Sequence, residues 1–147
     1  MNINLVKKGG SNLMSTFIQQ SSGILILLFL IVTFLQSGLD KLFDWKGNVS
    51  FTKEHFKSSP LAKGTPFLLA IILFLEIIAS LFMIMGVYSI LSYGEISSTG
   101  LLGLQLSALT LIFLLIGQRL AKDYAGAMTL AVYFIITILG MMVFSKL

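Results

Sequence analysis

One carboxylate lies near the middle of the longest apolar stretch of this 147-residue chain, at Glu76 within residues 66–91. At 1.5 Å per residue, a helix over this stretch is about 39 Å long, which exceeds the hydrocarbon core of a bilayer at about 30 Å. A charge at mid-span costs about 2.5–3.5 kcal/mol. We therefore expect Glu76 to be neutral, paired with a cation, or turned toward a protein or water interior.

A carboxyl group in such a place could serve three kinds of chemistry. It could pass a proton, contact the ring of a quinone, or hold a cation. The alternative interpretation is structural, because a hydrogen bond between helices or a buried ion pair would also use a carboxyl group there. The residues around Glu76 leave both interpretations open.

Four further polar side chains are candidates for the same intramembrane site. Lys41 ends the first apolar stretch, on the membrane side where the stretch of Glu76 begins. Because Glu76 lies about 15 Å along its helix, we expect Lys41 to reach outward to the headgroups, with a direct pair as the alternative. Gln36 and Ser37 lie one turn before Lys41 and could line the same cavity. Gln105 is the only amide well inside the third apolar stretch, where it could bond across helices or bind a ligand.

A second polar group lies between the third and fourth apolar stretches, at residues 118–124. Asp123 has the side chain and the position of an N-cap for the last helix. Arg119, in the same group as Tyr124, could hold a lipid phosphate or the carboxylate of a partner protein. Trp45, among lysines after the first stretch, is typical of an anchor at headgroup level. These four residues are candidates for an interface with lipid or protein.

The chain offers few groups for catalysis or metal binding. It has no cysteine and a single histidine, His55, in a polar segment among Lys53, Glu54 and Lys57. Without thiols or a second histidine, the chain excludes thiol redox chemistry, iron–sulfur ligation by cysteine and bis-histidine haem ligation. We expect His55 to be a solvated loop residue, and we predict no catalytic residue, no metal site and no cofactor bound by this chain alone.

The composition indicates an integral membrane protein. Hydrophobic residues make up 56% of the chain and charged residues 11%, and the mean hydropathy is +0.97. Soluble proteins contain about 45–50% and about 25% of these classes. The net charge of +4 could suggest nucleic acid, but the lysines are spread between apolar runs and fit anionic lipid headgroups better. The expected partners are the lipid bilayer and other integral membrane proteins, and not nucleic acid.

Four apolar stretches are long enough to cross a membrane. They cover residues 23–41, 66–91, 101–117 and 125–145, and a polar loop at 42–65 separates the first two. The other links are short, which is typical of antiparallel neighbours. The sequence therefore predicts an all-α integral membrane protein, with a single transmembrane domain folded as an antiparallel four-transmembrane-helix bundle.

The basic residues favour one orientation in the membrane. Seven lie in the first and third connections: Lys41, Lys46, Lys53, Lys57, Lys63, Arg119 and Lys122. The opposite side carries three: Lys7, Lys8 and Lys146. Because basic residues are enriched in cytoplasmic loops, we expect both connections in the cytoplasm and both termini outside.

Three short motifs follow one another along the chain. They are SGLDKL at 37–42, LEIIA at 75–79 followed by MG at 85–86, and DYAGA at 123–127 leading into YF at 133–134. With four apolar stretches in 147 residues, this order resembles the DoxX family of small bacterial membrane proteins. The resemblance extends from about residue 23 to the C-terminus.

The resemblance implies a place in respiration. The family is named after a small subunit associated with a membrane quinol oxidase and a thiosulfate:quinone oxidoreductase. By this resemblance, we expect a non-catalytic accessory subunit of a larger bacterial membrane complex, respiratory and quinone-linked, in the cytoplasmic (inner) membrane. A quinone is the one cofactor that the resemblance suggests. Two alternatives stay open: a small carrier that moves a proton or cation through Glu76, and an assembly factor for other membrane proteins.

Overall fold

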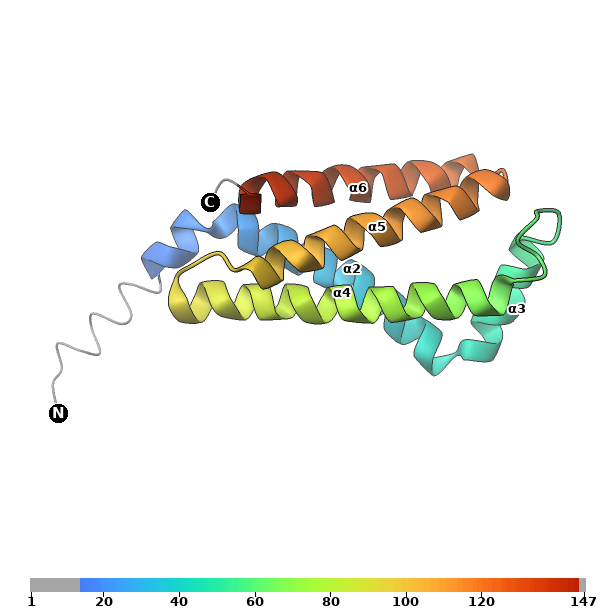
Figure 1. Cartoon of the computed structure of the whole chain (residues 1–147), viewed down its shortest axis with the longest axis horizontal. Coiled ribbons are helices and arrows are strands. Elements are labelled where there is room, and N and C mark those ends of the chain that lie inside the picture. Colours follow the sequence, from blue (N-terminus) through green and yellow to red (C-terminus); the bar gives the residue numbers. More distant parts are fainter. Residues whose placement is uncertain (1–13, 146–147) are drawn as a thin grey trace, which may run out of the picture.

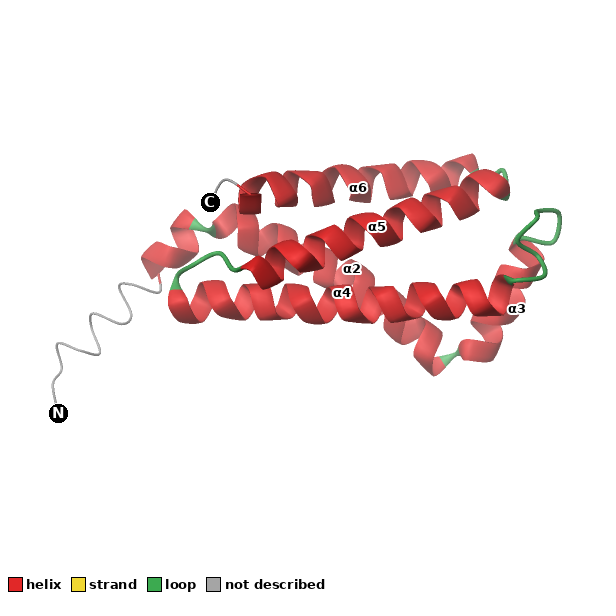
Figure 2. Cartoon of the chain, viewed as in Figure 1, coloured by secondary structure: helices red, strands yellow, loops and turns green. Residues whose placement is uncertain are grey.

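The computed structural model describes residues 14–145, and in this part of the chain helices are the only regular elements. Four helices are long and apolar enough to span a membrane: α2 (Ser21–Phe43), α4 (Thr65–Tyr93), α5 (Ser98–Leu120) and α6 (Tyr124–Ser145). A shorter helix, α3 (Trp45–His55), lies between α2 and α4, and the loop after it is the longest of those joining these helices (Figure 2). The predicted all-α four-helix membrane bundle is confirmed.

The four long helices run alternately in opposite directions (Figure 1). Helix α4 packs against α2 and α5, and α6 packs against α5 and α2, so the four helices close into a ring. The start of α2 and the end of α6 lie at one end of the bundle, whereas α3 and the turn between α5 and α6 lie at the other. The connections that carry most of the basic residues therefore share one end.

The outward faces of the long helices are apolar. Val32, Phe74 and Met128 are 63%, 63% and 71% exposed, and many other large hydrophobic side chains on these helices are exposed as well. Soluble monomers rarely expose contiguous apolar surface of this extent. A lipid bilayer therefore surrounds these helices, and the chain is a multi-pass membrane protein.

Helices α4 and α5 approach each other most closely near the loop that joins them, where glycines face the neighbouring backbone. A Cβ atom added at Gly86 would lie 2.6 Å from the Cα of Gly100, and one added at Gly103 would lie 2.8 Å from the backbone nitrogen of Met83. Small residues permit this kind of contact between membrane helices. From this crossing α5 diverges from α4 toward the end of the bundle that carries α3 (Figure 1).

The polar segment 42–65, expected to be a loop, contains helix α3. The Asp44 carboxylate accepts a hydrogen bond from the backbone N–H of Gly47 at 3.0 Å and so caps this helix. The Asn48 amide donates to the carbonyl oxygens of Asp40 at 3.1 Å and Asp44 at 2.8 Å, which satisfies the end of α2. Glycine and asparagine often mark turns. Here Gly47 and Asn48 lie in the first turn of α3, so the loop prediction is wrong for this part of the segment.

Candidate functional site

Lys41 and Glu76 form a buried ion pair between α2 and α4. The Nζ atom of Lys41 lies 3.0 Å from Oε2 and 3.2 Å from Oε1 of Glu76, and the two side chains are 12% and 3% exposed. The Ser37 hydroxyl lies between them, because it donates to Oε1 of Glu76 at 2.9 Å and accepts from Nζ of Lys41 at 2.6 Å. We call these three residues the α2–α4 pair site.

The side chain of Lys41 reaches Glu76 because it runs back along its own helix. Its Nζ donates to the backbone carbonyl of Ser37 at 3.0 Å, one turn toward the N-terminus of α2. Side chains on an α-helix lean in this direction. Since Lys41 lies near the C-terminal end of α2, leaning back moves its ammonium deeper into the membrane by about one helical turn, or about 5.4 Å. The expectation that Lys41 reaches outward to the headgroups is therefore wrong.

A glycine beside the pair site brings α2 close to α4. Gly38 is buried, and a Cβ atom added there would lie 2.9 Å from Cδ1 of Ile77 and 3.7 Å from Cβ of Glu76. The backbone of α2 can therefore approach α4 directly next to Glu76. This approach lets the short Ser37 side chain reach the carboxylate.

Gln36 and Gln105, two of the predicted members of this site, lie outside it. Both side chains are exposed on the outward faces of α2 and α5. Gln36 is adjacent to Ser37 in sequence, but successive residues of a helix are rotated by about 100°. Gln105 likewise faces away, whereas Leu104 on the same turn of α5 is fully buried. The structure thus brings together Ser37, Lys41 and Glu76 only, of the five residues predicted.

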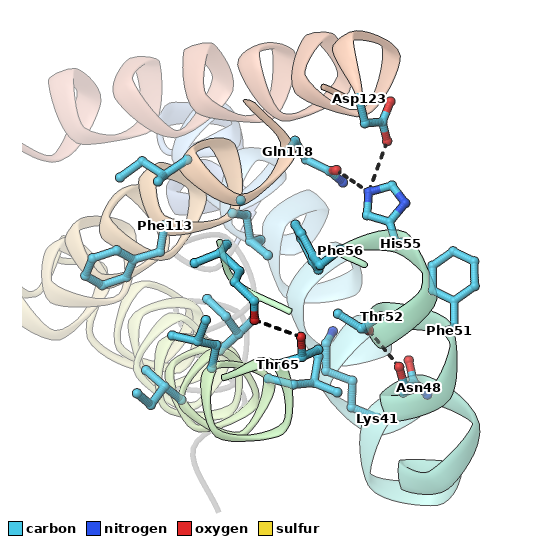
Figure 3. Close-up of a pocket in the computed structure, with 18 residues that line it drawn as sticks. Lys41, Asn48, Phe51, Thr52, His55, Phe56, Thr65, Phe113, Gln118 and Asp123 are labelled. Atoms are coloured by element: carbon cyan, nitrogen blue, oxygen red, sulfur yellow. Dashed lines mark hydrogen bonds and ion pairs between the residues drawn. The ribbon is translucent and has the colours of Figure 1, made fainter. Parts of the chain in front are cut away.

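A second polar group forms where the last turn of α3 meets the turn between α5 and α6. The Nε2 atom of His55 lies 2.8 Å from Oε1 of Gln118 and 3.7 Å from Oδ2 of Asp123 (Figure 3). His55 is half-buried and also meets the edge of the Phe56 ring, with 5.0 Å between the ring centroids. The expectation of a solvated loop histidine is therefore wrong, because His55 is the last residue of α3 and its side chain contacts Gln118 of α5.

Three of the four predicted interface residues, Arg119, Asp123 and Tyr124, belong to this second group or lie next to it. Oδ1 of Asp123 accepts a hydrogen bond from the backbone N–H of Gly126 at 2.8 Å, which confirms Asp123 as the cap of α6. The guanidinium carbon of Arg119 lies 4.9 Å from the centre of the Tyr124 ring, and both side chains are exposed. Trp45 is half-buried at the first residue of α3, at the opposite end of that helix from His55.

A cavity of about 530 Å³ lies between α3, α4 and α5, and no pattern of residues had indicated it. Its walls are mainly apolar, with leucine and isoleucine side chains from α4 and α5 and the rings of Phe51, Phe56 and Phe113. Lys41 lines one part of it, and His55, Gln118 and Asp123 line another (Figure 3). Its volume and its few polar groups are those of a small-molecule site.

The described residues show no grouping of side chains that would hold a metal. Between residues 14 and 145, no cluster of three or more histidine, aspartate or glutamate side chains gathers at metal-binding distances. The same part of the chain contains no buried side-chain polar atom without a hydrogen-bond partner.

The chain matches the model of a known family. The family model described as DoxX matches residues 23–120, which run from the first turn of α2 to the end of α5. Two of the three motifs noted in the sequence lie inside this range, and with them all members of the α2–α4 pair site. The comparisons with curated proteins and with solved structures gave no match.

Proposed function

Because this chain belongs to the DoxX family, we propose that it is an accessory subunit, non-catalytic by itself, of a larger quinone-linked respiratory complex in the bacterial cytoplasmic membrane. The family consists of small membrane proteins that are often associated with quinone-linked or oxidoreductase functions. The chain has the four membrane spans that such a subunit needs for contact with other integral membrane proteins. The complex would oxidise or reduce a quinone, and this chain would form part of the protein around the quinone.

The observation that carries the proposal is the closed hydrogen bonding of the α2–α4 pair site. The Lys41 ammonium contacts the Ser37 carbonyl, the Ser37 hydroxyl and both oxygens of the Glu76 carboxylate. Each charge is matched inside the group, so neither Lys41 nor Glu76 needs a further partner within the span. Such a pair holds two helices in register and supports a structural role for this chain within an assembly.

The orientation in the membrane belongs to the same proposal. The two connections at the α3 end carry seven basic residues, and the positive-inside tendency supports a cytoplasmic location for that end. Both termini would then lie outside. The three lysines of the other side, Lys7, Lys8 and Lys146, lie outside the described residues.

Purification of the tagged chain at native expression level, in a mild detergent, tests the proposal. We expect subunits of a quinone-linked oxidoreductase at a fixed ratio in the mass spectrum. Recovery of a free monomer or homodimer alone would contradict it. Substoichiometric recovery with immature membrane proteins would contradict it in favour of an assembly factor. A tagged four-helix membrane protein of another family, expressed at the same level, controls for non-specific association in detergent.

A carrier function is the second candidate, and one observation favours it. Lys41 both pairs with Glu76 and lines the cavity, so a single ion pair joins the Glu76 carboxylate to the wall of the cavity. If Glu76 passes a proton or cation, Glu76→Gln must abolish flux into proteoliposomes without unfolding the protein. Absence of flux in the unaltered protein would remove this candidate.

A further inference from the structure

We infer that the cavity between α3, α4 and α5 binds a lipid-soluble amphiphile that has an uncharged, hydrogen-bonding head and a single apolar chain. The inference deepens the proposed function and rests on it for the choice of a quinone as probe. The cavity has a volume of about 530 Å³, and its lining is mainly apolar with a few polar groups. Ligand sites have this combination of size and lining.

The apolar walls open toward the bilayer. Ile71 on α4 and Phe113 and Ile116 on α5 line the cavity and are also 37%, 45% and 50% exposed. Because α4 and α5 are membrane spans, the surface around these three side chains faces hydrocarbon. A ligand would therefore enter from the lipid phase, with its apolar chain between α4 and α5.

The polar end of the cavity offers hydrogen bonds to the head of such a ligand. Oε1 of Gln118 is taken by His55, whereas its amide nitrogen has no hydrogen-bond partner among the described residues. An amide N–H₂ group donates to carbonyl or hydroxyl oxygens. Phe51, stacked on His55 with 6.0 Å between the ring centroids, adds an aromatic face at the same end.

The charges at the cavity select against an anionic head. The Lys41 ammonium is matched by the Glu76 carboxylate, so it is not available to a phosphate or carboxylate ligand. Asp123 lines the polar end and would repel a negative charge there. A phospholipid headgroup or a fatty acid carboxylate is therefore a poor occupant, and an uncharged ring or hydroxyl head is a good one.

Titration of the purified full chain in detergent with decyl benzoquinone tests the inference. We expect saturable binding that Gln118→Leu weakens about tenfold, as the loss of one buried hydrogen bond would. Leu114→Trp, inside the cavity, and Ile116→Trp, at its exposed mouth, should each abolish saturable binding. Ile116 is half exposed, so a tryptophan there should not disturb the packing of the bundle. The Ile116→Trp variant therefore tests the inference even if Leu114→Trp unfolds the protein.

A matched control uses the second hollow of the molecule. Ile84 lines an apolar hollow of about 320 Å³ between α2 and α4, and Ile84→Trp should leave quinone binding unchanged. Equal binding by the Ile116→Trp and unaltered proteins would overturn the inference, as would saturable binding of phosphatidylglycerol but not of the quinone. If the unaltered chain does not bind the quinone but still purifies with its partner subunits at a fixed ratio, this inference alone is overturned. If the chain binds the quinone but purifies without partner subunits, the proposed function alone is contradicted.

Discussion

The Nζ atom of Lys41 lies 3.0 Å from Oε2 of Glu76, although the two residues are 35 positions apart in the chain. This contact ties the C-terminal end of α2 to the first half of α4 inside the membrane-spanning bundle. Ser37 completes it with one hydrogen bond to each partner. The relationship explains how a carboxylate is tolerated in the longest apolar stretch, because its charge is matched by a cation from the neighbouring helix.

Removal of one partner of this pair should destabilise the bundle far more than removal of both. Lys41→Met or Glu76→Met alone leaves an unmatched buried charge, and we expect a loss of about 3–5 kcal/mol in the free energy of unfolding. The double variant should recover most of that loss. Unfolding by a denaturing detergent, followed by circular dichroism, measures the four proteins of this cycle. Equal and additive losses would show that the two side chains are not coupled.

Ser37 should matter for stability, whereas its neighbour Gln36 should not. Ser37→Ala removes the hydroxyl that bridges the ammonium and the carboxylate, and we expect a loss of about 1–3 kcal/mol. Gln36→Ala is the matched control because Gln36 is exposed and lies outside the pair site. The same unfolding measurement compares the two variants, and an equal effect of both would contradict the geometry described for α2.

The glycine crossing of α4 and α5 should be intolerant of a methyl group. Gly103→Ala would place a Cβ atom 2.8 Å from the backbone of Met83. We expect this overpacking to cost about 1–3 kcal/mol, which outweighs a gain of up to about 1 kcal/mol in helix propensity. Gly64→Ala is the control, since its Cβ atom would meet no atom closer than 3.8 Å. Thermal denaturation in detergent measures both, and a stabilised Gly103→Ala protein would contradict the close crossing.

The contact of His55 with Gln118 should hold α3 in place. His55→Ala removes a hydrogen bond of 2.8 Å, which typically contributes about 0.5–1.5 kcal/mol. Amide hydrogen exchange in α3 should therefore become faster in this variant. Lys53→Ala, an exposed change in the same helix, should leave exchange nearly unaltered. Unchanged protection of α3 in His55→Ala would show that the helix is held by other contacts.

The fold class follows from the sequence because four long apolar stretches have few alternatives to crossing a membrane. The charged members of the pair site were also identifiable, since a buried carboxylate requires a cation and Lys41 is on the correct side. Their direct contact could not be predicted. The depth of each residue was estimated from the helical rise per residue, which gives the position of the Cα atom and takes no account of how far a lysine side chain extends. The cap at Asp123 was predictable from its position before the last helix.

The direction in which a polar side chain points within a span could not be predicted, because the spans are apolar on every face. An amide within such a span gives no sign of whether it points inward, which is why Gln36 and Gln105 were placed in the site wrongly.

Helix α3 did leave a signal, since Trp45, Val49, Thr52 and Phe56 recur at helical spacing, and all four are half-buried. The cavity had none, because it results from the divergence of α5 from α4 beyond their glycine crossing.

The most direct test of the proposed non-catalytic role is the quinone-linked turnover of the proposed complex, purified with a chain that carries Lys41→Met together with Glu76→Met. We predict assembly at the normal subunit ratio and a turnover within about twofold of the unaltered complex, because the pair makes no interaction that is specific to a transition state. A complex that assembles at the normal ratio but has lost its turnover would contradict this role.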